Sequence, residues 1–430
     1  MLLVNLDRPS PRARYVVRHV FERMLGWPVQ FAASAEAFRT SDGPRLSYGP
    51  LPIEGAFHVP SDGALDMLGV GMREPAHHGS GDDLVLFPVD EGSDVFAACF
   101  YLLALFEEYA VDDRDAHDRP RTTSLFVVRH GVERFPLLDR WVLRLAEDLR
   151  RHFPELPVPK RAYRHVLTVD VDNGLKYAGR SFKRAFGASL KELLQGDVLG
   201  LRERWQVRRG AMADPYLRAA DELAAVLDGV DRFVAFILAR GEEVFDHGAD
   251  IDHPAYRELI QRLAALGELG LHPSYGTSRN AGLLDTERQQ LQHATTSSIH
   301  LSRQHFLRWR MPDTLRHLHD TGFTEDHTLG FSDRIGFRAG TCTPFPWYDL
   351  EREQETPLIL WPFATMDSAL SEHVGRTPEQ ALSDMKEVAD AVRAVNGTFV
   401  SVWHDRYLSG DREFASWPGV MRQLVQHARV

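Results

Sequence analysis

The 430-residue sequence contains little cysteine, with Cys99 and Cys342 far apart in the chain. Two distant cysteines make no disulfide framework, which is typical of a protein from a reducing compartment. Long apolar runs are also lacking. The longest, residues 95–106, falls short of the roughly 20 residues that a membrane span needs, and Asp7 and Pro9 interrupt the apolar N-terminus. These absences predict a cytoplasmic protein with no membrane span.

Excess positive charge is absent as well. The formal net charge is -11, and nucleic-acid binding depends on clustered Lys and Arg, so we expect no nucleic-acid partner. A hydrophobic content of 43% and a charged content of 26% are ordinary for a globular enzyme. A chain of 430 residues suits two domains better than one.

Prolines at residues 154–159 separate two regions of different pattern. Residues 1–158 mix helices with short strand-like pieces and predict a smaller α+β domain of unassigned role. In residues 159–430, apolar strands alternate with amphipathic helices, which predicts a mostly parallel α/β sheet or barrel. The charged residues 174–213 predict a helical insertion, either a lid over a site or a surface element.

The candidate chemistry begins where an apolar strand, residues 165–169, runs into Asp170 and Asp172. Alternation along a strand places the two carboxylates on one side, where like charges need a cation, a shared proton or a chemical task. The alternative is a strand end whose carboxylates cap a turn at Asn173 and Gly174. Partners from other strand ends decide between the two interpretations.

Two further predicted strands end in histidine, at His272 and at His404. Imidazole and carboxylate together suit Zn²⁺ or another divalent ion, although a lone histidine is more often a loop hydrogen bond. His404 is placed to act as a general acid. Arg338, predicted at a strand end, either orients a carboxylate or forms a structural salt bridge.

Further candidates for a third metal ligand or a substrate contact are Tyr275, Thr277, Ser278, Arg303 and His305. Residues 77–79 predict a polar loop, and the charge run at residues 112–119 predicts solvated surface rather than a metal site.

In this order, the segments resemble the polysaccharide deacetylases of carbohydrate esterase family 4, which share the NodB homology domain. The resemblance covers about residues 160–430 and rests on Thr-x-Asp-x-Asp, His-Pro-Ser, Phe-Arg-Ala-Gly and a strand ending in Trp-His. Within the family, the sequence is most similar to the branch that has an Asp-x-Asp first motif and an extra N-terminal domain. The resemblance implies a distorted (β/α) barrel of about seven strands.

The resemblance also implies roles for five residues: Asp170 as general base, Asp172 and His272 as metal ligands, Arg338 as the residue that orients the base, and His404 as general acid. The family's second histidine, four residues after the first, is replaced here by Gly276. Either Thr277, Ser278, His305 or water completes the ligand set, or metal binding has been lost.

The function that the resemblance implies is metal-dependent removal of an N-acyl group, chiefly acetyl, from an amino sugar. The sugar would belong to a polysaccharide, a glycoconjugate or a precursor, and the metal would be Zn, with Co, Ni, Mn or Fe as alternatives. A catalytically silent carbohydrate-binding or assembly protein is the alternative from another class. Hydrolysis of a non-sugar amide would use the same residues, and the sequence sets no oligomeric state.

Overall fold

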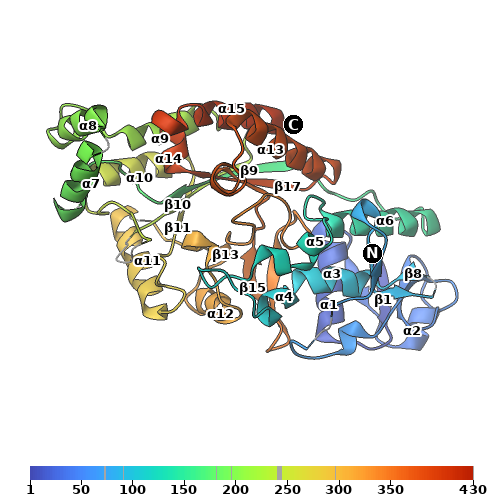
Figure 1. Ribbon diagram of the computed structural model, residues 1–430. Helices are drawn as coiled ribbons and strands as arrows, with labels where there is room; N and C mark the ends of the chain where they lie inside the picture. Colours follow the sequence, from blue (N-terminus) through green and yellow to red (C-terminus); the bar gives the residue numbers. More distant parts are fainter. Residues whose placement is uncertain are drawn as a thin grey trace.

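The computed structural model describes residues 1–429 apart from positions 72–73, 91, 181, 195, 240–244 and 296. Two parts of the chain lie side by side (Figure 1). Residues up to about 155 form the blue-to-cyan part, and the strands and helices from residue 164 onward form the rest. In neither part do the described residues form a helix that is long and apolar enough to cross a membrane.

The N-terminal part is built on a four-stranded sheet in the order β2-β1-β3-β4, in which every neighbouring pair is parallel. Its strands are β1 (Leu2–Leu6), β2 (Val29–Phe31), β3 (Arg45–Gly49) and β4 (Phe57–Pro60). Parallel neighbours need crossover connections, and α1 (Pro11–Arg18) and α2 (Ala35–Arg39) lie in two of them. This parallel α/β sheet replaces the α+β arrangement expected from the sequence.

The remainder of the N-terminal part is mainly helical. Its helices are α3 (Val95–Leu103), α4 (Phe106–Ala110), α5 (Phe126–Arg129) and α6 (Leu137–His152). Two small antiparallel pairs join β5 (His77–His78) to β6 (Val85–Leu86) and β7 (Pro88–Val89) to β8 (Gly92–Ser93). The long helix α6 buries Leu138, Val142 and Leu149 on one face, as the spacing of its apolar residues dictates.

The second part contains a nine-stranded sheet in the order β14-β15-β13-β12-β11-β10-β9-β17-β16. Only β14 is antiparallel to its neighbour. The strands are β9 (Arg164–Val171), β10 (Arg232–Ile237), β11 (Glu268–Leu271), β12 (Leu301–Ser302), β13 (Glu325–Asp326), β14 (Phe345–Asp349), β15 (Gln354–Leu360), β16 (Thr365–Met366) and β17 (Thr398–His404).

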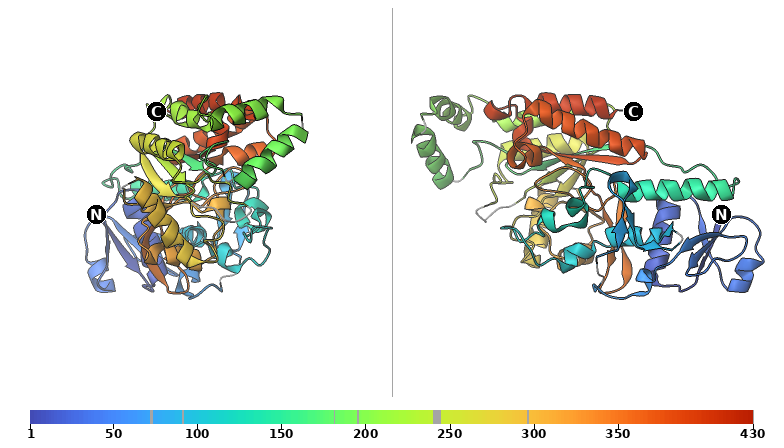
Figure 2. Two further views of the ribbon diagram at one scale, coloured as in Figure 1. Left: turned by 90° about the vertical axis from the view of Figure 1, so that its left-hand side faces the viewer. Right: turned by 45° about the vertical axis from the view of Figure 1, so that its right-hand side comes forward.

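Helices cover this sheet and project from one end of it. They are α7 (Phe182–Leu194), α8 (Val198–Arg208), α9 (Arg218–Ala224), α10 (Pro254–Leu266), α11 (Ala281–Thr295), α12 (Asp313–Asp320), α13 (Pro378–Ala394), α14 (Asp405–Leu408) and α15 (Trp417–Ala428). Proline at the first turn starts α10, and a capping box of Thr377 and Gln380 starts α13. Near residues 174–213, where the sequence predicts a helical insertion, the structure has the helices α7 and α8 (Figure 2).

The nine-stranded sheet must curl. β15 and β16 lie at opposite ends of its parallel portion, yet only residues 361–364 separate them in the chain. Eight flat strands would hold these edges about 34 Å apart, whereas the five backbone steps from Leu360 to Thr365 reach at most about 18 Å. Along this bridge, Phe363 N–H donates to Leu329 O and Ala364 N–H to Val400 O, both at 2.9 Å. The sheet therefore curls far enough to bring β15 and β16 together, and the distorted barrel of about seven strands stays a prediction.

The two parts of the chain share one hydrophobic core. Buried residues of α1, α3 and β14 belong to a single cluster, and the rings of Phe100 and Tyr348 lie 5.1 Å apart. Tyr15 Oη also donates a hydrogen bond to Pro346 O at 2.7 Å. The N-terminal part is thus packed firmly against the β14–β15 edge, close to the loops that approach the strand ends.

Candidate active site

The carboxyl end of β9 carries the two carboxylates that the sequence pattern indicated. β9 lies inside the sheet between β10 and β17, so its end is surrounded by neighbouring strand ends. Asp405 holds the turn that follows, because its carboxylate accepts hydrogen bonds from the N–H groups of Asn173 and Gly174 at 3.0 and 2.7 Å. The turn is therefore capped by Asp405, and Asp170 and Asp172 both line a cavity.

Asp172 meets two histidines. Its Oδ1 lies 3.1 Å from Nε2 of His272, just after β11, and 3.7 Å from Nε2 of His305, in the turn after β12. Within the described chain, this buried Oδ1 has no hydrogen-bond partner, so the 3.1 Å contact lacks hydrogen-bond geometry. One ligand atom from each of the three residues lies within 4.8 Å of the other two. Donor atoms that converge in this way are the arrangement expected around a shared cation.

The two histidines are each oriented through the other ring nitrogen. His272 Nδ1 lies 2.6 Å from Arg303 O, and His305 Nδ1 lies 2.9 Å from Asp246 Oδ1. Protons assigned from these partners place a donor at each Nδ1 and a lone pair at each Nε2, facing Asp172. Metal-bound imidazoles are supported in the same way. Two imidazoles and one carboxylate therefore fit Zn²⁺ or another divalent first-row ion.

The charges around Asp172 keep its carboxyl group ionised. Burial alone raises its pKa, but His305, His272 and His404 hold the pKa well below its usual range. Burial lowers the pKa of His272, whereas the carboxylates of Asp170 and Asp172 raise it above its ordinary value. The ligand cluster thus contains the anionic oxygen that a divalent cation prefers.

A buried arginine holds the second carboxylate. Arg303 Nη1 donates to Asp170 Oδ1 at 2.7 Å and to Thr168 Oγ1 at 2.9 Å. Its Nε donates to His327 O at 2.9 Å, which fixes the plane of the guanidinium. Arg303 therefore orients Asp170 toward the cavity in one position.

The sequence predicted this orienting role for Arg338, and the structure corrects it. Arg338 Nε donates to Glu108 in the N-terminal part at 2.6 Å. Residues 330–344, all of them described, form no strand, so nothing carries Arg338 to the strand ends. Its guanidinium forms the salt bridge that was the alternative interpretation.

His404 ends β17 in register with Asp170 of β9. Its Nδ1 lies 2.6 Å from Asp367 Oδ1, and its backbone N–H donates to Asp367 Oδ2 at 2.8 Å. Its Nε2 lies 3.9 Å from Asp172 Oδ2. Burial alone would lower the pKa of His404, but Asp367, together with Asp172 and Asp170, raises it to about 10. At neutral pH this imidazole is a proton donor in the wall of the cavity.

The loop after β11 brings fewer residues to the ligand cluster than the sequence predicted. Thr277 Oγ1 donates to Ser274 O at 2.7 Å, and Thr277 and Ser278 line a separate cavity beside α12. Tyr275 is 8% exposed, and its hydroxyl lies 3.2 Å from His117 Nδ1. Of the proposed third ligands, the structure brings His305 to Asp172 and leaves Thr277 and Ser278 outside the ligand cluster.

The cavity over these side chains has a volume of about 460 Å³, within the usual size of small-molecule sites. Besides the residues above, its lining includes Arg119, Tyr216, Phe245, Phe306, Glu372, Arg406 and Phe414. The lining therefore combines ionisable groups with aromatic rings.

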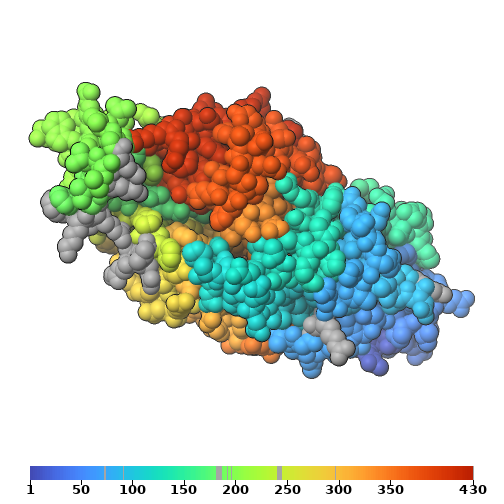
Figure 3. Space-filling model, viewed as in Figure 1, coloured from blue at the N-terminus to red at the C-terminus, as the bar shows by residue number. Residues whose placement is uncertain are grey.

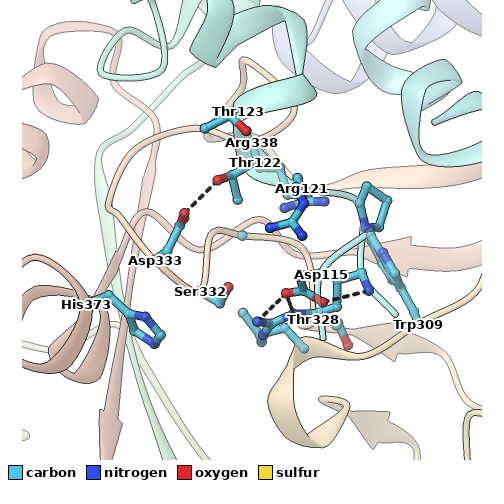
Figure 4. A pocket seen from close by; sticks show the side chains of 14 residues that line it. Asp115, Arg121, Thr122, Thr123, Trp309, Thr328, Ser332, Asp333, Arg338 and His373 are labelled. Carbon is cyan, nitrogen blue, oxygen red and sulfur yellow. Dashed lines mark hydrogen bonds and ion pairs between the residues drawn. The ribbon is translucent and has the colours of Figure 1, made fainter. Parts of the chain in front are cut away.

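A second cavity of about 240 Å³ adjoins the first and shares Arg119, Leu307, Ser332 and His373 with it. Figure 4 shows Thr122 from the N-terminal part facing Asp333 across it, with Thr122 Oγ1 donating at 2.6 Å. Residues of the N-terminal part thus form a wall beside the candidate site.

The solvated surface predicted for residues 112–119 is wrong at Asp115 and Arg119. Their side chains are only 24% and 14% exposed, and both line the second cavity. Arg119 Nη1 donates to Phe306 O at 2.7 Å, which ties the charge run to the loop after β12. The interaction partner lies 187 residues away in the sequence, so no local pattern revealed it.

Asp246 and Asp367 are site residues that the sequence reasoning missed. Asp367 directly follows β16, so the same strand-end signal that marked Asp170 could have found it. Asp246 lies in the loop beyond β10 and carries no strand-end signal. Both carboxylates support an imidazole of the site rather than lining it.

A second group of ligating side chains, Glu74, His77 and His130, lies in the N-terminal part. Both Glu74 oxygens accept hydrogen bonds from Arg129 Nη1 at 2.9 Å. The guanidinium already supplies the positive charge there, so this group is better explained as an ion-pair cluster than as a metal site.

Comparisons with known proteins give limited matches. A family described only as a family of unknown function, DUF7033, matches residues 2–154. A solved structure described as a candidate polysaccharide deacetylase from Mycobacterium smegmatis is 14% identical, with a TM-score of 0.40. That similarity covers 63% of this chain and 85% of the other. No curated protein matches.

Proposed function

We propose that this protein is a metal-dependent hydrolase that removes an N-acyl group, chiefly acetyl, from an amino sugar of a polysaccharide, a glycoconjugate or a precursor. The observation that carries the proposal is the Asp172, His272 and His305 cluster, which shares one cavity with Asp170 and His404. Such a set provides a cation site, a base and an acid around one reacting centre.

In this proposal, Asp172, His272 and His305 hold a divalent cation, with Zn²⁺ as first choice. When bound there, a divalent cation would act as a Lewis acid toward the acyl carbonyl and would lower the pKa of water. Asp170 accepts the proton of the attacking water, and Arg303 keeps its carboxylate oriented through the 2.7 Å hydrogen bond. His404 donates a proton to the departing amine, and Asp367 holds its imidazole in place at 2.6 Å.

The lining of the two adjoining cavities supports a sugar substrate. Aromatic rings at Tyr216, Phe245 and Phe306 offer apolar faces, Ser332 offers a hydroxyl group to both cavities, and the second cavity adds that of Thr122. Sugars present both apolar C–H faces and many hydroxyl groups, so this mixture suits them. The second cavity gives room for a further sugar unit next to the one that loses its acyl group.

The silent carbohydrate-binding alternative was favoured by Gly276, which stands where the related family has a histidine. His305 offers a third ligand from another loop, so that observation no longer favours a site without metal. A non-sugar amide remains a candidate substrate class for the same acid and base.

The test is metal content followed by acetate release. Protein purified with supplemented metal is expected to hold about one equivalent. It should release acetate from N-acetylated chito-oligosaccharides, and Asp170→Asn should abolish that release while keeping the metal. Less than a tenth of an equivalent of Zn, Co, Ni, Mn or Fe would contradict the proposal. If the protein hydrolyses only non-sugar amides, its substrate is an amide of that class and not an amino sugar.

A further inference from the structure

α7 and α8 form a helical hairpin that projects from the body of the molecule beside α9 and α10 (Figures 1 and 2). In the space-filling view it is the green protrusion at the upper left (Figure 3).

The acidic side chains of the hairpin are all engaged in internal contacts. Glu192 accepts hydrogen bonds from the buried Arg204 at 2.5 and 3.0 Å. Asp197 pairs with Arg412 of the body, and Glu203 accepts a hydrogen bond from Tyr177 Oη at 3.0 Å. The three carboxylates of the hairpin thus contact other residues of the hairpin or of the body.

Several of its apolar side chains are exposed instead, although Val207 of α8 is buried. Exposed fractions are 48% at Leu190, 64% at Leu193, 79% at Leu194, 71% at Val198, 69% at Leu199 and 54% at Trp205. Helices of soluble proteins normally bury their apolar stripe and expose their charges. This inverted arrangement creates an apolar patch, which marks an interaction surface.

The hairpin sequence has an excess of positive charge. Residues 182–209 contain seven Lys and Arg against three Asp and Glu, although the whole chain has a net charge of -11. Arg202, Arg208 and Arg209 are exposed, and the three acidic residues have the internal partners described above. A second copy of the hairpin would bring like charges together, whereas an anionic apolar surface complements the patch.

We propose that the α7–α8 hairpin docks on a lipid bilayer that contains anionic lipids. Leu193, Leu194 and Leu199 enter the interface between headgroups and acyl chains, and Trp205 lies at headgroup level. The exposed arginines bind the anionic headgroups, an attraction that salt screens. Peripheral docking of this kind needs no membrane-spanning helix.

The hairpin adjoins the candidate active site. Arg412, the partner of Asp197, directly precedes Glu413 and Phe414, which line the main cavity. Docking would therefore keep the cavity near the bilayer surface. The proposal does not depend on deacetylase activity, because binding can be measured without any substrate.

The test is co-sedimentation of the full-length protein with vesicles. We expect binding to phosphatidylcholine vesicles that contain phosphatidylglycerol, weaker binding to phosphatidylcholine alone, and release at high salt. The double variant Leu193→Glu, Leu199→Glu should lower the partition coefficient about tenfold or more, because it places carboxylates in the interface. Replacing Arg202 and Arg208 with Gln should weaken binding to the anionic vesicles only.

Leu51→Glu is the matched control, because Leu51 is 77% exposed but lies in the N-terminal part. It should bind vesicles like the wild type. Absence of wild-type binding to anionic vesicles would overturn the proposal, as would equal effects of the hairpin and control variants. Self-association that the hairpin variants abolish, without vesicle binding, would identify a second copy as the occupant and overturn it as well.

Discussion

Arg303 Nη1 donates a hydrogen bond to Asp170 Oδ1 at 2.7 Å, and both side chains are almost completely buried. The guanidinium is fixed by two further hydrogen bonds, to Thr168 and to the carbonyl group of His327. A buried ion pair that loses one partner commonly destabilises a protein by about 3–5 kcal/mol. A substitution that tests the role of Arg303 must therefore keep its positive charge.

Arg303→Lys should lower kcat by about 100-fold, because an ammonium group cannot reproduce the fixed fork that orients the proposed base. Arg316→Lys is the matched control, since Arg316 also pairs with a buried carboxylate, donating to Asp349 at 2.6 and 2.8 Å, and lies away from both cavities. It should leave kcat nearly unchanged. Arg303→Lys and Arg338→Lys should both be assayed with a short substrate. If kcat falls in Arg338→Lys but not in Arg303→Lys, Arg338 is the residue that orients the base.

Asp367→Asn should move the alkaline limb of the kcat profile to lower pH. The Asp367 carboxylate, against the effect of burial, helps raise the pKa of His404 to about 10. A general acid works in its protonated form, so activity is retained below that pKa and lost as pH rises through it. The amide of the variant carries no negative charge, so the pKa of His404 should be lower than in the wild type. A bound cation would lower this pKa in the wild type and the variant alike. An unchanged limb would show that another group donates the proton.

Thr123→Trp should reduce the preference for longer substrates. Thr123 is exposed and faces the second cavity (Figure 4), where an indole ring would occupy the space proposed for a further sugar unit. The ratio of kcat/KM for an N-acetylated oligosaccharide to that for the monosaccharide should fall about tenfold. Thr40→Trp, at an exposed site away from both cavities, is the control. Equal ratios in both variants would place the sugar chain elsewhere.

His19→Phe should make the protein more resistant to acid. His19 is fully buried, neither ring nitrogen has a hydrogen-bond partner in the described chain, and burial together with Arg23 lowers its pKa to about 3. The unfolded chain binds the proton more readily, so the contribution of His19 to stability is present above about pH 6.5 and lost as pH falls.

Between pH 7 and pH 5, His19 should account for a loss of about 2 kcal/mol in the free energy of unfolding. Phenylalanine suits the site because Tyr15 and Phe345 already face the imidazole, with ring centroids 6.3 and 6.2 Å away. Urea unfolding of both proteins at the two pH values measures the difference. Parallel losses in the variant and the wild type would rule out His19 as the source.

Much of the site was predictable because four of its residues lie at, or directly after, the carboxyl ends of strands with clear apolar runs. Asp170, Asp172, His272 and His404 all gave this signal, and parallel strands bring their carboxyl ends to one edge. Arg338 was misplaced because its local sequence resembles a known motif, whereas its position depends on a contact with Glu108, 230 residues away.

The remaining site residues had weaker signals. β12 is only two residues long, too short for any periodicity, so Arg303 and His305 were candidates without assigned roles. Asp246 acts through His305 from a loop, and its contact spans 59 residues. The parallel character of the N-terminal sheet depends on strand pairing, which short strand-like pieces do not specify.

The most direct test of the central claim is anomalous diffraction from crystals grown with Zn²⁺, recorded on both sides of the zinc absorption edge. The account predicts one peak about 2.0–2.2 Å from a carboxylate oxygen of Asp172 and from Nε2 of both His272 and His305. His305→Ala should weaken or abolish this peak, whereas Thr277→Ala should not. A fully occupied zinc site that excludes His305, or no zinc at this cluster, would contradict the account.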